Sequence, residues 1–501
     1  MTQQVIITTP ANSGIGSSPK AAFDICNANF TDVYTQVGAL NNQSAGVSVL
    51  NYGADPTGAA DSTAAIQSAD AAATAAGLLL YFPPGTYAVN MSIGLVRGGA
   101  SWLGAGRNVS ILKATATSIT TPHYLVQIDN KSNFTTSRLG FDISLPTFSS
   151  GAQGSSALLC VGGTNWETFD CAFTGIQAYT NGTYPNGGDQ WSVKDCYFNM
   201  PTPSTNYNQA INVQNPSGRH QVCRNTCVGT GIFSQAGEGL FEGNIVTGWK
   251  FGAGITIDAV FTSRGVNNRI IGNYCLNGAG NPDVNSVYSA GIENSSGNAI
   301  IVGNHCYNNQ GPGINLFGPN CLVTGNQCLN NNQAGSVFGG ITAYDVPQAS
   351  GGSLGASGSI IVDNVLSDTQ GSPTQAYGYL EQNHTNGFGT GSLHNMLVAR
   401  NVATGNTTAA ALYVGTAPLL DFVNGPLQVA AQVAPTSGGS ATCGVLVSST
   451  ANLGLFFGTG APTFSAAEGA IYSNTTGAAG ARLYVNTSSG SGTTWTALTT
   501  P

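Results

Sequence analysis

One short phrase, an asparagine followed by any residue and then by a small apolar residue, constrains the fold more than any other feature of the sequence. It recurs at Asn225-Thr226-Cys227, Asn244-Ile245-Val246, Asn273-Tyr274-Cys275, Asn304-His305-Cys306, Asn326-Gln327-Cys328, Asn364-Val365-Leu366 and Asn401-Val402-Ala403. Successive asparagines are 19, 29, 31, 22, 38 and 37 residues apart, so the phrase persists while its spacing changes. A solenoid has this property, because each coil keeps its buried strand positions and places insertions in loops.

Coils of such a solenoid lie about 4.8 Å apart, so equivalent residues of successive coils form ladders. We expect the asparagines to lie at turns, to adopt the left-handed backbone conformation, and to bond amide to amide with the next coil. The Val, Ile and Cys of the phrase would fill the interior. The chain has eleven cysteines, and we predict that they are reduced, buried, small apolar residues and not a disulfide framework.

A second phrase marks one strand of each coil. It reads AINVQ from Ala210, GIFSQ from Gly231, GITID from Gly254, GIENS from Gly291, GINLF from Gly313 and GITAYD from Gly340. The Ile and the residue two positions later are expected to point inward, and the residues one and three positions after Ile to point outward. These outward positions would form one continuous face, and we expect any groove to lie there.

Composition excludes several classes of protein. Charged residues make up only 7% of the chain, yet 41% of residues are hydrophobic and 9% aromatic, which is not the profile of a disordered protein. The surface must then be covered by Ser, Thr, Asn, Gln and Gly, whose neutral groups suit contact with sugars. A net charge of -8 with only 14 Lys plus Arg argues against nucleic acid as a partner.

The sequence indicates neither membrane insertion nor export. No stretch approaches the roughly 18 apolar residues that span a bilayer. The segment Met1–Ala11 lacks the basic and apolar parts of a secretory signal, so we expect synthesis without a signal peptide. We predict no cofactor and no metal site. The nearest approach to one, Cys223 and Cys227 near His220, lacks the CxxC or clustered-His spacing that metals require.

Residues 1–46 are expected to form an N-terminal head. Apolar residues recur at spacings of three and four, as in the heptad pattern of a helix that packs against partner helices. They are Phe23, Cys26, Phe30, Val33, Val37 and Leu40. A single amphipathic helix packed on its own domain explains the same spacing. The segment SSPKAAFDICNANFTDVY, Ser17–Tyr34, resembles the short N-terminal motif by which many phage tail fibres and spikes join the virion. That resemblance implies a head for attachment and trimerisation.

Residues 47–113 carry the most specific family signal. They predict a strand, a turn at Asp55-Pro56-Thr57-Gly58, a helix capped by Asp61 or Ser62, a strand over Leu78–Phe82, and a turn at Pro83-Pro84-Gly85. The order of these elements and their amino-acid sequence resemble the opening segment of the pectate-lyase-like superfamily of right-handed β-helices, found in phage tailspikes and polysaccharide-degrading enzymes. The resemblance implies the fold and not a reaction. Capping and turn roles account for Asp55 and Asp61.

We therefore predict an all-β protein, a right-handed, single-stranded parallel β-helix over residues 47–416, trimeric, between the head and a small β module at 417–501. The phrases GTGAPTFSAAEGAIYSNTTG and ARLYVNTSSGSGTTWTAL in this last module resemble a C-terminal module common among phage tail proteins. A trimerisation cap for the open end of the β-helix is the favoured role. Carbohydrate binding through Trp495, Tyr472 and Tyr484 is the alternative.

A phage spike of this kind, by resemblance, is a virion-attached homotrimer made in the bacterial cytoplasm and joined through its head to a baseplate or tail protein. It binds a bacterial surface polysaccharide, capsule or O-antigen, and usually cleaves it. Three functions stay open: an endo-acting glycoside hydrolase, a polysaccharide lyase, and a binding-only fibre. Hydrolysis is favoured over elimination because cations along the β-helix are few, chiefly Arg219, Arg224, Lys250, Arg264 and Arg269.

Two acidic residues on the outward positions of the second phrase are the predicted catalytic pair. Asp258 ends GITID and Glu293 lies in GIENS. On adjacent coils, their carboxylates would lie near 8 Å apart, within the roughly 6.5–9.5 Å used by inverting hydrolases. Glu293 would be the acid and Asp258 the base.

A reserve pair is Asp345 and Glu381, expected further along the same face. The predicted substrate-binding residues are Tyr288, Tyr344, Tyr379 and Arg264. Tyr344 and Tyr379 would serve as platforms for sugars. The alternative is that all four carboxylates are ordinary surface groups with no catalytic role.

Overall fold

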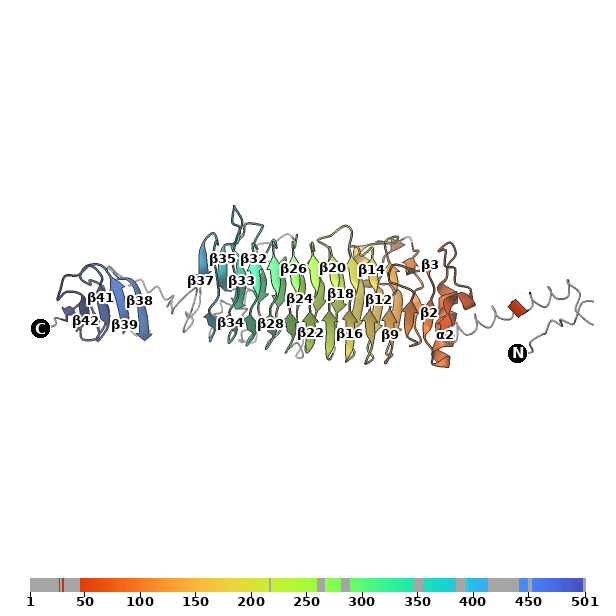
Figure 1. Ribbon diagram of the computed structural model, residues 1–501, viewed down its shortest axis with the longest axis horizontal. Coiled ribbons are helices and arrows are strands. Elements are labelled where there is room, and N and C mark those ends of the chain that lie inside the picture. The colour runs from red at the N-terminus through yellow and green to blue at the C-terminus, as the bar shows by residue number, and fades with distance from the viewer. Residues whose placement is uncertain are drawn as a thin grey trace, which may run out of the picture. The chain divides into compact units, whose positions relative to one another are not determined.

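The repeated phrases fold as successive coils, each of which adds one short strand to each of three parallel sheets (Figure 1). The computed structural model describes residues 27, 29–30, 46–116, 118–215, 218–258, 266–280, 289–345, 355–383, 393, 395–412, 441–448 and 453–498. The successive strands of one coil lie in different sheets, so each strand pairs with strands of the coils before and after it, as β19 does with β16 and β22. The predicted fold class, a right-handed parallel β-helix, is confirmed.

The first sheet has 13 strands, in the order β1 (Val47–Ser48), β2 (Leu80–Phe82), β5 (Trp102–Gly104), β9 (Thr135–Ser137), β13 (Glu167–Phe169), β16 (Trp191–Lys194), β19 (His220–Cys223), β22 (Gly239–Glu242), β25 (Arg269–Ile271), β28 (Ile300–Val302), β31 (Leu322–Thr324), β34 (Ile360–Val362) and β36 (Leu397–Ala399). The second has 10, in the order β3 (Gly85–Val89), β6 (Ser110–Ala114), β10 (Gly140–Asp142), β14 (Ala172–Thr174), β17 (Tyr197–Asn199), β20 (Thr226–Val228), β23 (Ile245–Thr247), β26 (Tyr274–Leu276), β29 (His305–Tyr307) and β32 (Gln327–Leu329).

The third sheet has 12 strands: β4 (Leu95–Val96), β8 (Tyr124–Asp129), β12 (Ser155–Val161), β15 (Thr180–Asn186), β18 (Gln209–Val213), β21 (Ile232–Ser234), β24 (Ile255–Ile257), β27 (Ile292–Asn294), β30 (Ile314–Leu316), β33 (Gly339–Asp345), β35 (Tyr377–Asn383) and β37 (Ala409–Leu412). A two-stranded sheet pairs β7 (Ser118–Ile119) with β11 (Thr147–Phe148). The helices are η1 (Val49–Tyr52), α2 (Thr63–Ala76) and η2 (Ser150–Ala152).

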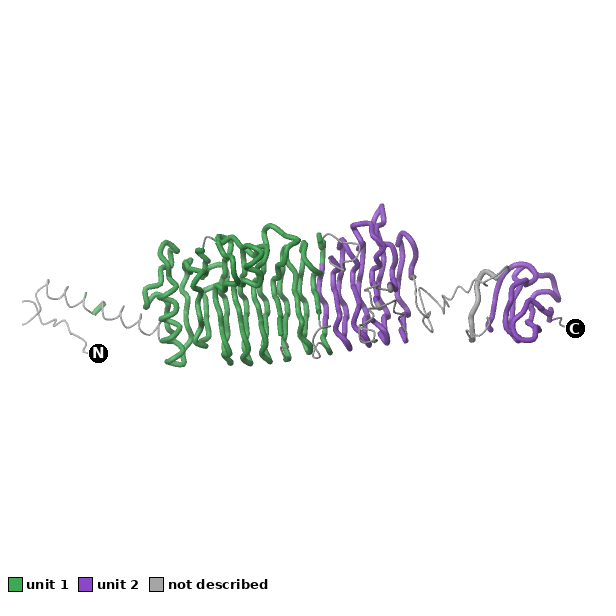
Figure 2. The backbone as a smooth tube through the Cα atoms, turned by 180° about the vertical axis from the view of Figure 1, so that it is seen from behind, with its two compact units in different colours: residues 1–269, 276–281 green, residues 270–275, 282–501 purple. Residues whose placement is uncertain are grey.

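Two compact units make up the chain (Figure 2). The first unit comprises residues 1–269 with 276–281, and the second comprises 270–275 with 282–501. Inside the first unit, aligned side chains form the core in columns. Phe141, Phe173 and Phe198 stack with parallel rings whose centroids are 4.8 and 4.7 Å apart. This regular column requires every coil to keep the same strand register.

The cysteines behave as predicted where the structure describes them. Nine are free thiols and all nine are buried. In the second unit, Cys306 and Cys328 are register partners on adjacent strands and belong to the core. Burial raises the pKa of the Cys160 thiol to about 12 and that of the Cys227 thiol well above its usual range. They are therefore unreactive space-filling residues.

The asparagine ladder forms as predicted in its bonding, but the prediction of its backbone conformation was wrong. Asn304 Nδ2 donates to Asn326 Oδ1 at 2.9 Å and to the carbonyl oxygen of Ile270 at 2.8 Å. The left-handed residue is the one before each ladder asparagine, as at Arg224 (φ 54°) and Asp363 (φ 58°). The physical reason is that the asparagine itself must enter the next strand with its amide pointing inward, so the turn falls one residue earlier.

The opening segment matches its prediction closely. Asp61 Oδ1 accepts a hydrogen bond from the Thr63 backbone N–H at 2.9 Å at the start of α2. Asp55 accepts from the backbone N–H groups of Thr57 and Ala60, and these bonds lower its pKa to about 2. The structural roles of both carboxylates are thereby confirmed. The predicted head helix lies outside the described residues apart from Asn27, Asn29 and Phe30.

The C-terminal segment forms the small β-structure that its alternating pattern predicts. A five-stranded sheet contains β38 (Ala441–Ser448), β39 (Leu453–Gly458), β41 (Ile471–Asn474), β42 (Leu483–Asn486) and β44 (Trp495–Ala497), beside a pair of β40 (Ala466–Ala467) and β43 (Ser491–Gly492). Tyr472 is fully buried against Phe464, and Trp495 Nε1 donates to the Phe464 carbonyl oxygen at 2.9 Å. Tyr472 is therefore a core residue and cannot stack on a sugar.

Within the part of the chain that the structure describes, no helix has the length and apolar character needed to cross a membrane.

Candidate functional site

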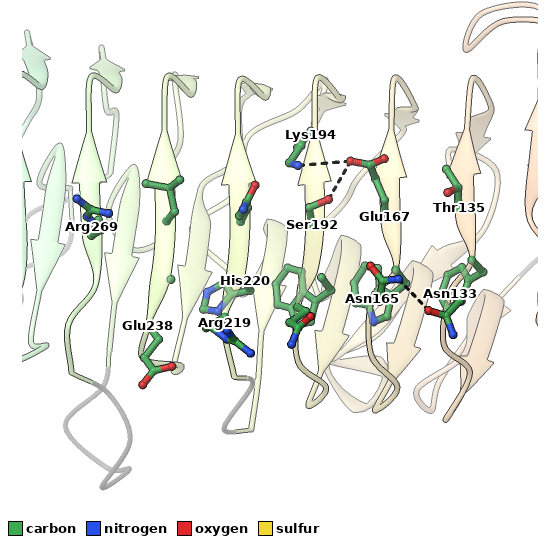
Figure 3. Close-up of a pocket in the computed structure, with 17 residues that line it drawn as sticks. Asn133, Thr135, Asn165, Glu167, Ser192, Lys194, Arg219, His220, Glu238 and Arg269 are labelled. Carbon is green, nitrogen blue, oxygen red and sulfur yellow. Dashed lines mark hydrogen bonds and ion pairs between the residues drawn. The ribbon is translucent and has the colours of Figure 1, made fainter.

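A groove of about 750 Å³ crosses the first sheet within the first unit (Figure 3). Three parallel rows of residues line it; each coil from β9 to β22 gives one residue to every row, and the coil of β25 gives only Arg269. The turn row is Asn133, Asn165, Gln190, Arg219 and Glu238; the floor row is Phe134, Trp166, Trp191, His220 and Gly239; the strand row is Thr135, Glu167, Ser192, Gln221, Leu240 and Arg269. Lys194 completes the lining. The predicted groove face was the third sheet, so this site was missed.

A repeated local sequence places these rows. GGTNW at 162–166 and GGDQW at 187–191 recur 25 residues apart. Asn165 and Gln190 adopt the left-handed conformation, with φ of 54° and 56°. A Cβ on Gly163 would lie 1.9 Å from the carbonyl oxygen of Lys131, so only glycine fits there. This repeat is the signal that sequence reasoning could have used to find the groove.

The floor row is a buried stack of rings. Trp166 and Trp191 lie parallel with centroids 5.0 Å apart, and Trp191 stacks on His220 at 4.7 Å. His220 Nδ1 donates to the carbonyl oxygen of Gly218 at 3.0 Å. Burial lowers the pKa of His220 to about 4, so its imidazole is neutral at pH 7. The stack gives the groove a rigid base that contributes no charge.

The strand row holds one carboxylate, Glu167, as the second of its six residues. Ser192 Oγ donates to Oε1 of Glu167 at 3.0 Å, and Lys194 Nζ lies 3.5 Å from that same oxygen (Figure 3). Among the described residues, Oε2 of Glu167 has no hydrogen-bond donor. Glu167 is thus held through one oxygen while the other is left for a ligand or for water.

Other charges stand at the ends and rim of the groove. Arg219 Nη2 lies 3.5 Å from Asp189 Oδ2, in a pair with both side chains substantially exposed. Glu238 and Arg269 are exposed. Figure 3 shows Glu238 at the turn end, directed away from the strand row, and Arg269 within that row. The remaining polar lining is amide and hydroxyl, as in Asn165 Nδ2, which donates to Asn133 Oδ1 at 2.8 Å.

No group of three or more His, Cys, Asp or Glu side chains is arranged to hold a metal ion among the described residues.

The predicted catalytic residues fall in different units. Asp258 directly follows β24 in the first unit and is half-buried, and burial raises its pKa. Glu293 lies in β27 in the second unit and is also half-buried. Their pairing stays a prediction. A raised pKa favours the protonated form, so Asp258 would suit the acid role rather than the base role first expected of it.

The reserve pair was wrong in one member. Register places Glu381 opposite Ala343 and Tyr379 opposite Ile341, and both partners are core positions. Glu381 is 1% exposed and its Oε1 accepts a hydrogen bond from the Tyr379 hydroxyl at 3.1 Å. Side chains alternate between the two faces of a strand, and the register of β35 places Tyr379 and Glu381 on its inward face, whereas the sequence prediction placed them on its outward face. Asp345 ends β33.

The predicted sugar platforms are not available as such. Tyr344 is 4% exposed and stacks on Phe317 with ring centroids 4.6 Å apart, and burial raises its pKa. Tyr379 is buried with Glu381. The other two predicted substrate-binding residues, Tyr288 and Arg264, lie outside the described residues.

Comparisons with known proteins agree on the fold. Residues 46–255 match a family model described as rhamnogalacturonase A/epimerase, pectate lyase-like. The A-module of mannuronan C-5 epimerase AlgE6 from Azotobacter vinelandii is 19% identical, with 76% of this chain and 100% of that chain covered and a TM-score of 0.53. The corresponding AlgE4 A-module is 18% identical, with 75% and 100% covered and a TM-score of 0.48.

The Dettilon tailspike protein (gp208) is 18% identical, with 70% of this chain and 68% of that chain covered and a TM-score of 0.40. No curated protein sequence matches the chain. Together, the family model and the AlgE6 module show that this chain has the pectate-lyase-like parallel β-helix fold.

Proposed function

We propose that this chain is a virion-attached spike that binds a bacterial surface polysaccharide along the groove of the first unit and hydrolyses that polysaccharide. The observation that carries the proposal is the groove lining, in which amides and hydroxyls surround Glu167, whose Oε2 accepts no hydrogen bond from the described residues. Sugar hydroxyls both donate and accept hydrogen bonds, and such a lining satisfies both. The names of the matched family and of its structural relatives, several of them polysaccharide-modifying enzymes, support the same class of substrate.

The groove suits a polymer rather than a single sugar. Its lining extends from β9 to β22 and on to β25, and four strand spacings from β9 to β22 span about 19 Å. A chain of sugars lying across the strands would contact one residue of each row in each coil from β9 to β22. We infer binding to internal segments of the polysaccharide, which corresponds to endo action.

Hydrolysis of a glycosidic bond needs carboxyl groups that donate a proton to the leaving oxygen and activate water. Two alternatives are proposed. Glu167 is the carboxylate in the groove itself, and its Oε2 would take a proton from the attacking water and pass it to the leaving oxygen. Asp258, which directly follows β24, and Glu293 in β27 of the third sheet are the pair that the sequence predicts. The two alternatives involve different sheets, so substitution separates them.

The test begins with polysaccharides from a panel of encapsulated Gram-negative strains. Binding with release of reducing ends, and no new absorbance from unsaturated sugars, supports endo-hydrolysis. New unsaturated absorbance would replace hydrolysis by a lyase reaction, and retained binding with neither signal would leave a binding-only fibre. Glu167→Gln is expected to cut turnover at least about a hundredfold. Should Asp258→Asn and Glu293→Gln do so instead, the third sheet carries the reaction.

The assembly is also a proposal. By its resemblance to phage spikes, the chain is inferred to be a homotrimer that attaches through residues 1–46 to a baseplate or tail protein, with residues 417–501 as a trimerisation module. Light scattering should then give three times the chain mass of 50.9 kDa. A monomer at micromolar concentration would contradict this part.

A further inference from the structure

One cation of the groove, Arg269, has no partner among the residues that the structure describes. Three of the 14 Lys and Arg side chains of the chain line the groove, at Lys194, Arg219 and Arg269. Lys194 is engaged with Glu167 and Arg219 with Asp189, each at 3.5 Å. Arg269 is exposed and forms no ion pair or hydrogen bond within the described residues. Its guanidinium is therefore available to a ligand.

Arg269 lies in the same row of the groove as Glu167. It lies in the strand row, which also contains Glu167, so both side chains face the same polymer (Figure 3). The sheet order from β13 through β16, β19 and β22 to β25 places about 19 Å, four strand spacings, between them. Glu238, the other charged lining residue without an ion pair in the described part of the chain, is directed away from this row.

We propose that the polysaccharide is acidic and that Arg269 binds the carboxylate of a sugar about four coils from Glu167. This inference rests on the proposed function and names its substrate class. A planar guanidinium with five N–H donors binds a carboxylate in a two-bond fork, which a neutral hydroxyl cannot match. The chain carries a net charge of -8 and would repel an anionic polymer in general. Attraction must then come from a local cation, and among the described lining residues Arg269 is the cation without an ion pair.

The experiment uses matched ligands and matched variants. The first polysaccharide that the protein binds is prepared in two forms, intact and with its carboxylates chemically reduced to hydroxymethyl groups. Dissociation constants for both forms are measured with the full-length parent, Arg269→Gln, Arg269→Lys and Lys250→Gln. Lys250 is exposed in the first unit outside the groove lining, so its variant removes the same charge without touching the site.

Four results are expected. Carboxyl reduction weakens binding to the parent at least about tenfold. Arg269→Gln weakens binding of the intact polymer by a similar factor but leaves binding of the reduced polymer unchanged. Arg269→Lys falls in between, because it keeps the charge and loses the fork, and Lys250→Gln behaves as the parent.

Two outcomes overturn the inference. If the bound polysaccharide contains no acidic group, or if reduction and Arg269→Gln act independently of each other, Arg269 does not read a carboxylate, while the binding function stands. If no polysaccharide binds at all, the proposed function fails together with this inference.

Discussion

The ring of Trp191 lies nearly flat on that of His220, with centroids 4.7 Å apart and an interplanar angle of 21°. His220 is 2% exposed, and this burial lowers its pKa from 6.5 to about 4. The His220 side chain is therefore protonated near pH 6.5 in the unfolded chain but only near pH 4 in the folded chain. Stability is full above the unfolded pKa and falls as pH drops through that window.

The loss between pH 7 and pH 4 should be about 3 kcal/mol from this group. His220→Phe keeps a ring in the stack and removes the titrating group, so its stability should fall less on acidification. Thermal midpoints of the parent and variant at pH 7 and pH 4 measure the difference. An equal acid-induced loss in both proteins would show that His220 is not responsible.

Truncating a ladder asparagine should destabilise the second unit. Asn304→Ala removes the amide that bonds Asn326, the Ile270 carbonyl oxygen and the backbone N–H of Asn273. Each buried polar group left unpaired costs about 1–3 kcal/mol, so a loss of at least about 3 kcal/mol is expected. Gln327→Ala, an exposed position on β32, is the control and should change stability by under about 0.5 kcal/mol. Denaturant unfolding compares them, and equal stabilities would count against a structural ladder.

The thiols should be silent in the native protein. The nine described cysteines are buried and free, and burial raises the pKa of Cys227 far above its usual range. A thiol reagent should label at most Cys26 and Cys443, the two whose side chains the structure does not describe, and all eleven after denaturation. Adding a reductant should leave the thermal midpoint unchanged. Rapid native labelling of several thiols, or unfolding on reduction, would be inconsistent with a reduced interior column.

The coils could be predicted from the sequence because their turns repeat a local pattern. Asn304 and Asn326 each follow a left-handed turn residue in their own coil. The opening segment has the recognisable order of strand, helix and strand. The groove could not be predicted in the same way. Glu167 and Ser192 are 25 residues apart and meet only because their coils stack in register on the first sheet.

The direction in which a side chain points depends on the same register. Glu381 is predicted from the sequence to face outward, yet its register pairing with Ala343 places it in the core. The prediction that Asp258 and Glu293 face outward depends on the same alternation of side chains. Both residues are half-buried, so their catalytic role stays a prediction. The missed signal was present in the sequence, since the two Gly-Gly-x-Asn/Gln-Trp phrases mark both the left-handed turn and the ring stack under the groove.

The most direct test of the central claim fills the groove and leaves the rest of the protein unchanged. Gln221 is exposed in the middle of the strand row, and Gln327 is exposed on the second sheet outside the groove lining. The affinities of Gln221→Trp and Gln327→Trp for a surface polysaccharide that the parent binds are to be compared. A groove-bound polymer predicts that Gln221→Trp loses at least about tenfold in affinity through steric exclusion while Gln327→Trp binds as the parent does. Unchanged binding by Gln221→Trp would show that the polysaccharide does not lie in this groove.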